Sequence, residues 1–274
     1  MLEARNITVH YGARVAVRDV SLSVDSAKVI SIIGPNGAGK STLLQTLNGS
    51  VKPRVGEVVL DERPLPNYAR RVVAQRIAVV AQEADVRFPV TVFEFVLGGR
   101  YAWANVTAWG WESDRDIELA QNAIAETELK SFESRLMNEL SGGERQRAVL
   151  ARALATEAKI FLLDEPTANL DLAHQATMLR LIRSRCDMTG SAAVVVTHDV
   201  NLAAEFSDEV MLMKDGRTVA CGSPQEVLSE QLLKQVFDLH VLVDAHPVSG
   251  APRITPVHEI RSVPPGSPGG SIVQ

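Results

Sequence analysis

An early glycine-rich segment has the residue types and spacing that hold a chain of phosphates. Gly34-Pro-Asn-Gly-Ala-Gly-Lys-Ser41 matches the phosphate-loop pattern G-x-x-x-x-G-K-[ST] at every fixed position. The glycines let successive backbone N–H groups turn inward around an anion, and the helix expected after them presents its positive end to the same anion. We expect Lys40 to reach the β- and γ-phosphates of a nucleotide, Ser41 to ligate Mg²⁺, and Thr42 to contact the α-phosphate side. The residues expected to line the loop are Gly34, Pro35, Asn36, Gly37, Ala38, Gly39, Lys40, Ser41 and Thr42.

Two adjacent carboxylates, Asp164 and Glu165, follow an apolar run at residues 160–163. Such a run predicts a strand whose carboxyl end lies at the sheet edge where ligands bind. Because successive strand side chains point in different directions, we assign Asp164 to Mg²⁺ and Glu165 to polarising the attacking water. Alone, the run is typical of an ordinary strand end, and its pairing with a phosphate loop favours the catalytic interpretation.

A second candidate anion site is the turn Leu140-Ser-Gly-Gly-Glu144, which leads into a helix expected to begin near Ser141. Free N–H groups at the helix start and the Ser141 hydroxyl can bind an anion, although this turn is also typical of a plain helix cap. One nucleotide does not need two such sites from one chain. We therefore expect this turn to serve the γ-phosphate held by a partner molecule.

The elements that must position these residues follow an α/β pattern. Residues 29–33 are almost continuously apolar and end in glycine, as a strand buried on both faces does, and residues 41–47 follow with helical spacing. Residues 77–80, 160–163 and 192–196 have the same strand character, and helical segments alternate with strands. This alternation predicts an α/β domain with a mainly parallel sheet.

Other segments depart from that pattern. Alternation of apolar and polar residues near Ile7 and Val20 predicts an antiparallel β subdomain at the N-terminus. Between about residues 83 and 154 helical periodicity replaces strands, beginning with capping-box spacing at Thr91 and Glu94. Further along, Asp215-Gly216 predicts a hairpin turn and residues 224–237 a closing helix. From Pro247 onward the composition shifts to proline, glycine and serine, which predicts a disordered tail.

These patterns divide the chain into three parts. Residues 1–82 and 155–240 are expected to form a nucleotide-binding α/β core with the antiparallel β subdomain, and residues 83–154 a helical subdomain. Residues 241–274 are expected to be a C-terminal extension that is disordered after about residue 260.

Composition narrows the function classes. The 274 residues are 46% hydrophobic and 22% charged, which excludes wholesale disorder, and the net charge of −5 gives no overall attraction to nucleic acid. Two cysteines are too few for a disulfide framework and suit a reducing compartment. No run approaches the ~18 apolar residues that suggest a membrane span. We therefore expect a chain that serves a membrane only by docking to another subunit.

The order and spacing of these motifs resemble the ATP-binding cassette (ABC) family, the nucleotide-binding subunits of ABC transporters. Residues 34–41 correspond to its Walker A motif, 160–164 to Walker B and 140–144 to the signature motif. The resemblance covers residues 1–240 and implies a P-loop NTPase (RecA-like) core. Four further residues match: Tyr11, where the family stacks an aromatic ring on adenine, Gln82 of the Q-loop, Asp171 of the D-loop at 168–171, and the switch histidine His198. From the residues alone each has an ordinary alternative: Tyr11 as an apolar strand residue, Gln82 as a solvated strand end, Asp171 as the N-cap of the next helix and His198 as a core histidine.

The resemblance implies specific roles in ATP hydrolysis. Catalytic roles fall to Lys40, Gln82, Glu165 and His198, and a Mg²⁺ site to Ser41, Gln82 and Asp164. Two copies are expected to face each other head to tail, with ATP between the phosphate loop of one and the signature turn of the other. The other nucleotide contacts expected are Tyr11, Asp164 and Asp171 and, from the partner copy, Ser141, Gly142, Gly143 and Glu144.

Three segments narrow the resemblance to importer ATPases for iron siderophores, haem and cobalamin. Residues 87–100 are similar to that group, and residues 171–175 and 244–256 to its haem branch. This implies hemin uptake by a bacterial importer with two transmembrane permease subunits and an external substrate-binding protein. The chain would lie at the cytoplasmic face of the membrane and bind no nucleic acid. The alternatives are a ferric-siderophore or cobalamin importer and, less expected, a soluble ABC protein acting on ribosomes or DNA.

Overall fold

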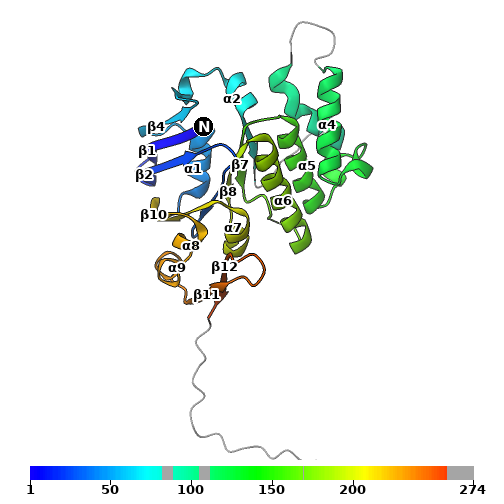
Figure 1. Cartoon of the computed structure of the whole chain (residues 1–274). Helices are drawn as coiled ribbons and strands as arrows, with labels where there is room; N and C mark the ends of the chain where they lie inside the picture. The colour runs from blue at the N-terminus through cyan, green and yellow to red at the C-terminus, as the bar shows by residue number, and fades with distance from the viewer. Residues whose placement is uncertain (82–88, 105–111, 169, 258–274) are drawn as a thin grey trace, which may run out of the picture.

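The structure, a computed structural model, describes residues 1–81, 89–104, 112–168 and 170–257 (Figure 1). These residues form a six-stranded sheet, a four-stranded sheet, a small two-stranded sheet and surrounding helices. The expected α/β class is confirmed.

The six-stranded sheet carries the expected parallel core. It consists of β3 (Val29–Ile33), β6 (Ile77–Val80), β7 (Ile160–Asp164), β8 (Ala192–Val196), β9 (Glu209–Lys214) and β10 (Arg217–Gly222), in the order β10-β9-β3-β8-β7-β6. All neighbours are parallel except β10, which is antiparallel to β9. The hairpin between them turns at Asp215 (φ 50°) and Gly216 (φ 76°), as the Asp-Gly pair predicts. Because β3, β8 and β7 are parallel neighbours, their carboxyl ends meet at one edge.

The N-terminal antiparallel sheet is also present. It contains β1 (Leu2–Tyr11), β2 (Arg14–Val24), β4 (Val55–Leu60) and β5 (Arg63–Pro64), in the order β2-β1-β4-β5. Helix α1 (Lys40–Leu47) packs between the two sheets, where Leu43 and Leu47 share one buried cluster with Ile7 and Ile32. This burial fixes the helix that follows the phosphate loop.

Helices replace strands between β6 and β7, as expected. In chain order the elements around and within this region are η1 (Leu65–Asn67), α2 (Arg70–Arg76), α3 (Val92–Leu97), η2 (Gly98–Trp103), α4 (Asp114–Glu126), η3 (Lys130–Phe132), η4 (Met137–Glu139), α5 (Gly142–Ala155) and, after β7, α6 (Leu172–Thr189). Capping boxes begin α3 at Thr91, α4 at Ser113 and α5 at Ser141. Figure 1 shows α4 and α5 on the far side of the molecule from the N-terminal sheet.

The C-terminal part differs from the sequence expectation in two ways. The single closing helix predicted for residues 224–237 is wrong: α8 (Pro224–Val227) and α9 (Glu230–Phe237) are separate, because Ser229 starts α9 as an N-cap that accepts from Leu232 N. The disordered tail predicted from Pro247 is also wrong in part. Strands β11 (Val241–Ala245) and β12 (Pro252–Pro256) form a hairpin on α7 (Val200–Phe206).

A side chain distant in sequence holds this hairpin. Asn201 donates from Nδ2 to Ile254 O at 3.1 Å and accepts from Ile254 N at 2.7 Å. Residues after 257, where the disorder prediction applies, lie outside the described residues. Within the described part of the chain, no helix combines the length and apolar character needed to cross a bilayer.

Candidate functional site

The phosphate loop joins the buried strand β3 to helix α1, and its shape depends on glycine. A Cβ at Gly39 (φ +96°) would lie 2.4 Å from Ala16 O, and one at Gly34 would lie 2.2 Å from Met213 O. Both distances are far below van der Waals contact, so neighbouring backbone passes where a side chain would stand. The glycines of the motif thus allow close packing of the loop against β2 and β9.

Lys40 is buried within this loop. Its side chain ammonium donates to Gly34 O at 2.8 Å and to Pro35 O at 3.1 Å, and the residue is 6% exposed. Burial lowers the pKa of Lys40, while the charges of Glu165 and Asp164 oppose that shift. The ammonium is therefore already removed from water and close to two carboxylates.

Asp164 ends β7 opposite the start of α1. Ser41 Oγ donates to Asp164 Oδ1 at 3.2 Å. Burial raises the pKa of Asp164, with a further contribution from Glu165, whereas Ser41, Lys40 and His198 favour its charged form. A hydroxyl and a carboxylate are the hard oxygen ligands that Mg²⁺ prefers, usually alongside substrate phosphates. Among the described residues no group of three or more His, Cys, Asp or Glu could hold a metal ion. The pair fits Mg²⁺ that is shared with a nucleotide.

Glu165 and His198 meet at the same edge from neighbouring strands. His198 Nε2 lies 2.6 Å from Glu165 Oε1, and the two side chains are 46% and 19% exposed. Glu165 has a left-handed backbone (φ 49°), and its N–H donates to Val196 O at 3.0 Å. A left-handed non-glycine residue is uncommon and often marks a functional site. The structure thus brings Lys40, Ser41, Asp164, Glu165 and His198 together.

The other predicted residues lie elsewhere or outside the described chain. Tyr11 is half exposed at the end of β1, and Asp171 caps α6 by accepting from His174 N at 2.9 Å. Ser141 caps α5, since its hydroxyl accepts from Glu144 N at 3.3 Å and its N–H donates to Glu144 Oε2 at 2.7 Å. Gln82 of the Q-loop and Asn169 of the D-loop lie outside the described residues.

The signature turn does not join the phosphate loop of its own chain. Within the described residues, no hydrogen bond or ion pair connects residues 141–144 to residues 34–42. Figure 1 places α1 and α5 on either side of β7. The backbone N–H of Ser141 and its hydroxyl, both used in the capping box, hold Glu144 and keep its pKa below the ordinary value. The N-terminus of α5 is therefore well formed and separate from the carboxylate edge.

One residue near the phosphate loop, Arg14, belongs to none of the sequence motifs. A Cβ at Gly37 would lie 3.7 Å from Arg14 Nη2, so this guanidinium lies over the phosphate loop. Arg14 is an exposed residue at the start of β2. In the sequence it is one arginine among many, and only the fold places its charge beside the loop.

Comparison with known proteins agrees with this geometry. The family model described as ABC transporter matches residues 17–168. The chain belongs to the ABC transporter family. It is accordingly an ABC ATPase, in which ATP is the nucleotide and its hydrolysis is coupled to transport.

Several relatives are similar over most of the chain. The hemin import ATP-binding protein HmuV of Thermobifida fusca is 43% identical over 257 residues, covering 94% of this chain and 89% of that protein. The cobalamin import ATP-binding protein BtuD of Halobacterium salinarum is 38% identical over 261 residues, covering 95% of this chain and 65% of that protein. Among solved structures, a dimeric bacterial ABC transporter cassette superposes with a TM-score of 0.73 at 29% identity, covering 81% of this chain and 98% of that one.

This ABC ATPase also has a groove away from the phosphate loop. Its volume is about 800 Å³, and it lies between α2, the edge strand β6, η2 and α5. Two apolar side chains on its walls are exposed, Val79 (44%) and Tyr101 (70%). Its charged lining residues in the described chain are all basic: Arg70, Arg71 and Arg152. Trp103, at the end of η2, is 40% exposed, and its Nε1 donates to Thr156 O at 3.0 Å.

Proposed function

We propose that this chain is the ATP-hydrolysing subunit of a bacterial importer that takes up hemin through a separate transmembrane permease. The observation that supports the catalytic part is the cluster at one sheet edge, where Lys40, the Ser41–Asp164 pair and the Glu165–His198 pair meet. The cargo is supported by the hemin import protein that is 43% identical over 94% of the chain.

The proposed chemistry uses positioning and charge neutralisation more than covalent steps. Lys40 would bind the β- and γ-phosphates, and Ser41 and Asp164, with Gln82, would hold Mg²⁺. When bound, Mg²⁺ neutralises phosphate charge and orients the phosphates. Glu165 would orient and polarise the attacking water through its carboxylate, which His198 positions from 2.6 Å. His198 can also donate to the γ-phosphate side.

The proposed active unit is a head-to-tail homodimer. The N-terminus of α5 has free backbone N–H groups and a positive helix end, but it lies apart from its own phosphate loop. Ser141, Gly142, Gly143 and Glu144 would therefore complete the nucleotide site of the partner copy, with Asp171 at the junction and Tyr11 against the adenine. A similar cassette forms a dimer, which supports this assembly.

The groove beside β6 is the proposed docking surface for the permease. Exposed apolar side chains such as Tyr101 and Val79 favour burial against a partner. Docking there would hold the ATPase as a peripheral subunit on the cytoplasmic face of the membrane. An external substrate-binding protein would complete the importer.

A second candidate cargo is cobalamin, because a cobalamin import protein is 38% identical over 95% of the chain. Both cargoes are tested by reconstituting the ATPase with its permease and binding protein in proteoliposomes. We expect hemin-loaded binding protein to stimulate ATP hydrolysis and cobalamin or ferric siderophore to have no effect. Stimulation by cobalamin or siderophore without stimulation by hemin would contradict the cargo proposal and leave the ATPase proposal intact.

A further inference from the structure

The 3₁₀ turn η2 lies directly against the carbonyl end of helix α5. A Cβ at Gly99 would lie 2.3 Å from Arg152 O, so the two backbones meet with no side chain between them. Helix α5 begins at Gly142, in the signature turn, and its 14 residues span about 20 Å. Its carbonyl end therefore touches η2, while its other end carries the residues proposed to act on the partner's nucleotide.

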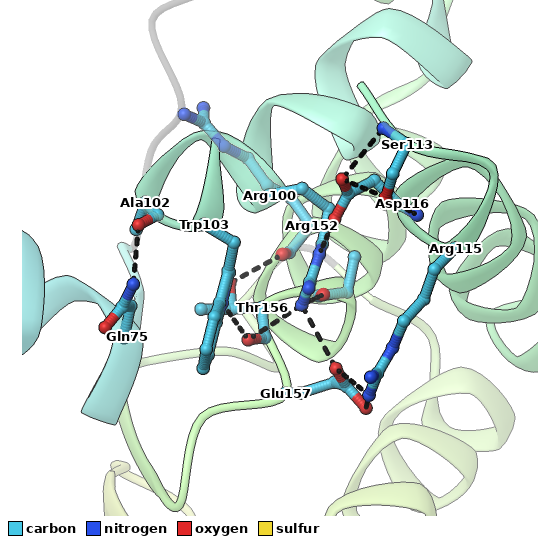
Figure 2. Close-up of polar contacts among 11 residues, drawn as sticks. Gln75, Arg100, Ala102, Trp103, Ser113, Arg115, Asp116, Arg152, Thr156 and Glu157 are labelled. Carbon is cyan, nitrogen blue, oxygen red and sulfur yellow. Dashed lines mark hydrogen bonds and ion pairs between the residues drawn. The ribbon is translucent and has the colours of Figure 1, made fainter. Parts of the chain in front are cut away.

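Arg100 of η2 stabilises this contact through hydrogen bonds. Its side chain is 4% exposed, and Nη1 donates to Ala155 O at 3.0 Å and to Thr156 O at 3.3 Å (Figure 2). These carbonyls end α5, where helical acceptors lack intrahelical donors and carry partial negative charge. Nε donates to Asp116 Oδ1 at 2.7 Å. Asp116 in turn accepts from Ser113 N at 3.0 Å and Ser113 Oγ at 2.7 Å, so both of its carboxylate oxygens accept hydrogen bonds.

The same turn forms one wall of the groove. Tyr101 and Ala102 line it, and on the opposite wall Gln75 Nε2 and Arg71 Nε each donate to Ala102 O at 2.7 Å. Figure 2 shows Gln75 reaching Ala102 on one side of η2 and Arg100 reaching the end of α5 on the other. The turn is therefore bonded to α2 on one side and to the signature helix on the other.

We propose that Arg100 is a positioning residue that fixes the signature helix to the wall of the docking groove, so that the groove wall and Ser141–Gly143 move as one body. Arg100 is buried within its own chain and acts through α5. A partner that presses on η2 then displaces the helix end as well. The inference rests on the proposed dimeric function and adds the residue that would transmit movement within it.

The test compares Arg100→Lys with a matched control, Arg115→Gln. Lysine keeps a positive charge beside Asp116 but has one donor nitrogen in place of the planar fork, so it loses the separate Nε bond to Asp116 and Nη1 bonds to the α5 carbonyls. Arg115 is 73% exposed and bonds the same Glu157 as Arg100, at 3.3 Å, but no helix carbonyl. In amide hydrogen exchange of the full chain, we expect exchange at residues 142–156 to rise about tenfold in Arg100→Lys and to stay unchanged in the control.

Two further measurements separate positioning from general damage. ATP affinity of the monomer should stay within about twofold, because the phosphate loop is distant and independent. In the Glu165→Gln background, ATP-dependent dimerisation should weaken about tenfold, the effect of one lost charge-assisted hydrogen bond. Trp103→Phe removes the bond to Thr156 O and keeps an aromatic ring beside Arg100. It should raise exchange and weaken dimerisation as Arg100→Lys does, but by less.

Three results would decide against the inference or its basis. Wild-type exchange and dimerisation in Arg100→Lys would overturn it. The inference would also be overturned if Arg100→Lys and the control Arg115→Gln both lost ATP affinity and exchange protection to the same extent. That result would indicate a merely structural role. If Glu165→Gln itself forms no dimer with ATP, the proposed function fails, and the exchange measurement on the monomer still decides the role of Arg100.

Discussion

Replacing Lys40 with methionine tests the phosphate loop directly, because methionine is an unbranched side chain of nearly the same length that lacks the ammonium and its hydrogen bonds. Lys40 is only 6% exposed in the folded protein, so a phosphate bound there meets a preformed charge. Two opposite unit charges about 4 Å apart attract by about 4 kcal/mol at an effective dielectric constant of about 20. Reaching the phosphate means giving up the bonds to Gly34 O and Pro35 O, about 1.5 kcal/mol each for a charged donor. The net effect is about 1 kcal/mol, or about a fivefold higher Kd for ATP.

The assay is isothermal titration of the Lys40→Met variant with ATP and, separately, with AMP. Because Lys40 is expected to bind only the β- and γ-phosphates, AMP affinity should not change. Lys159→Met is the matched control, since that lysine also donates to a backbone carbonyl, Thr189 O at 3.0 Å, outside the site. Equal losses for ATP and AMP would mean that the loop has collapsed, and unchanged ATP affinity would remove Lys40 from the phosphate site. Either result refutes the reasoning.

Three further substitutions test the rest of the site. Glu165→Gln should lower kcat about 10²–10⁴-fold, the usual effect of a lost acid–base group, and leave ATP bound in a stable dimer; wild-type turnover would contradict its role. Ser141→Ala should lower the free energy of unfolding by about 1 kcal/mol, since it removes the cap of α5, and should weaken ATP-dependent dimerisation seen by size-exclusion chromatography. Asp164→Asn should raise the thermal midpoint of the nucleotide-free protein at pH 7 and abolish stabilisation by Mg²⁺ and ATP. Burial raises the pKa of Asp164, so ionisation destabilises the fold above the ordinary pKa, 3.8, and the gain should vanish as the pH falls below that value.

The phosphate loop and the strand edge could be predicted because their signals are local. The five buried residues of β3, four of them apolar, the glycines and the start of α1 are contiguous in sequence, and each imposes its own backbone conformation. The caps at Thr91 and Ser141 follow from a Glu three residues later for the same reason, and Asp171 caps α6, which was the alternative interpretation of that residue. The roles assigned to the site residues stay predictions until the substitutions above are measured.

Features that depend on distant partners could not be predicted. Strand β12 has the proline-rich composition of a disordered segment, and only the amide of Asn201, 53 residues earlier, gives Ile254 its two hydrogen bonds. Arg100 likewise has no motif, because its acceptors lie 16 to 57 residues further along the chain. Composition and periodicity describe the conformation that a segment prefers in isolation. In these two cases contacts with residues distant in sequence determine the structure instead.

The pair Asp164 and Glu165 shows how the sheet itself sets the catalytic geometry. In an extended strand, successive side chains point to opposite faces, which would separate the two carboxylates. Instead the backbone at Glu165 turns left-handed (φ 49°), and the charges of both carboxylates act on Lys40. A conformation of this kind costs about 1–3 kcal/mol and persists only where neighbours enforce it. The neighbour is β8, since Val196 O accepts from Glu165 N at 3.0 Å and His198, two residues later, meets Oε1. The position of the water-polarising oxygen therefore depends on the pairing of β7 with β8, and weakening that pairing should misplace Glu165 without altering any residue of the site.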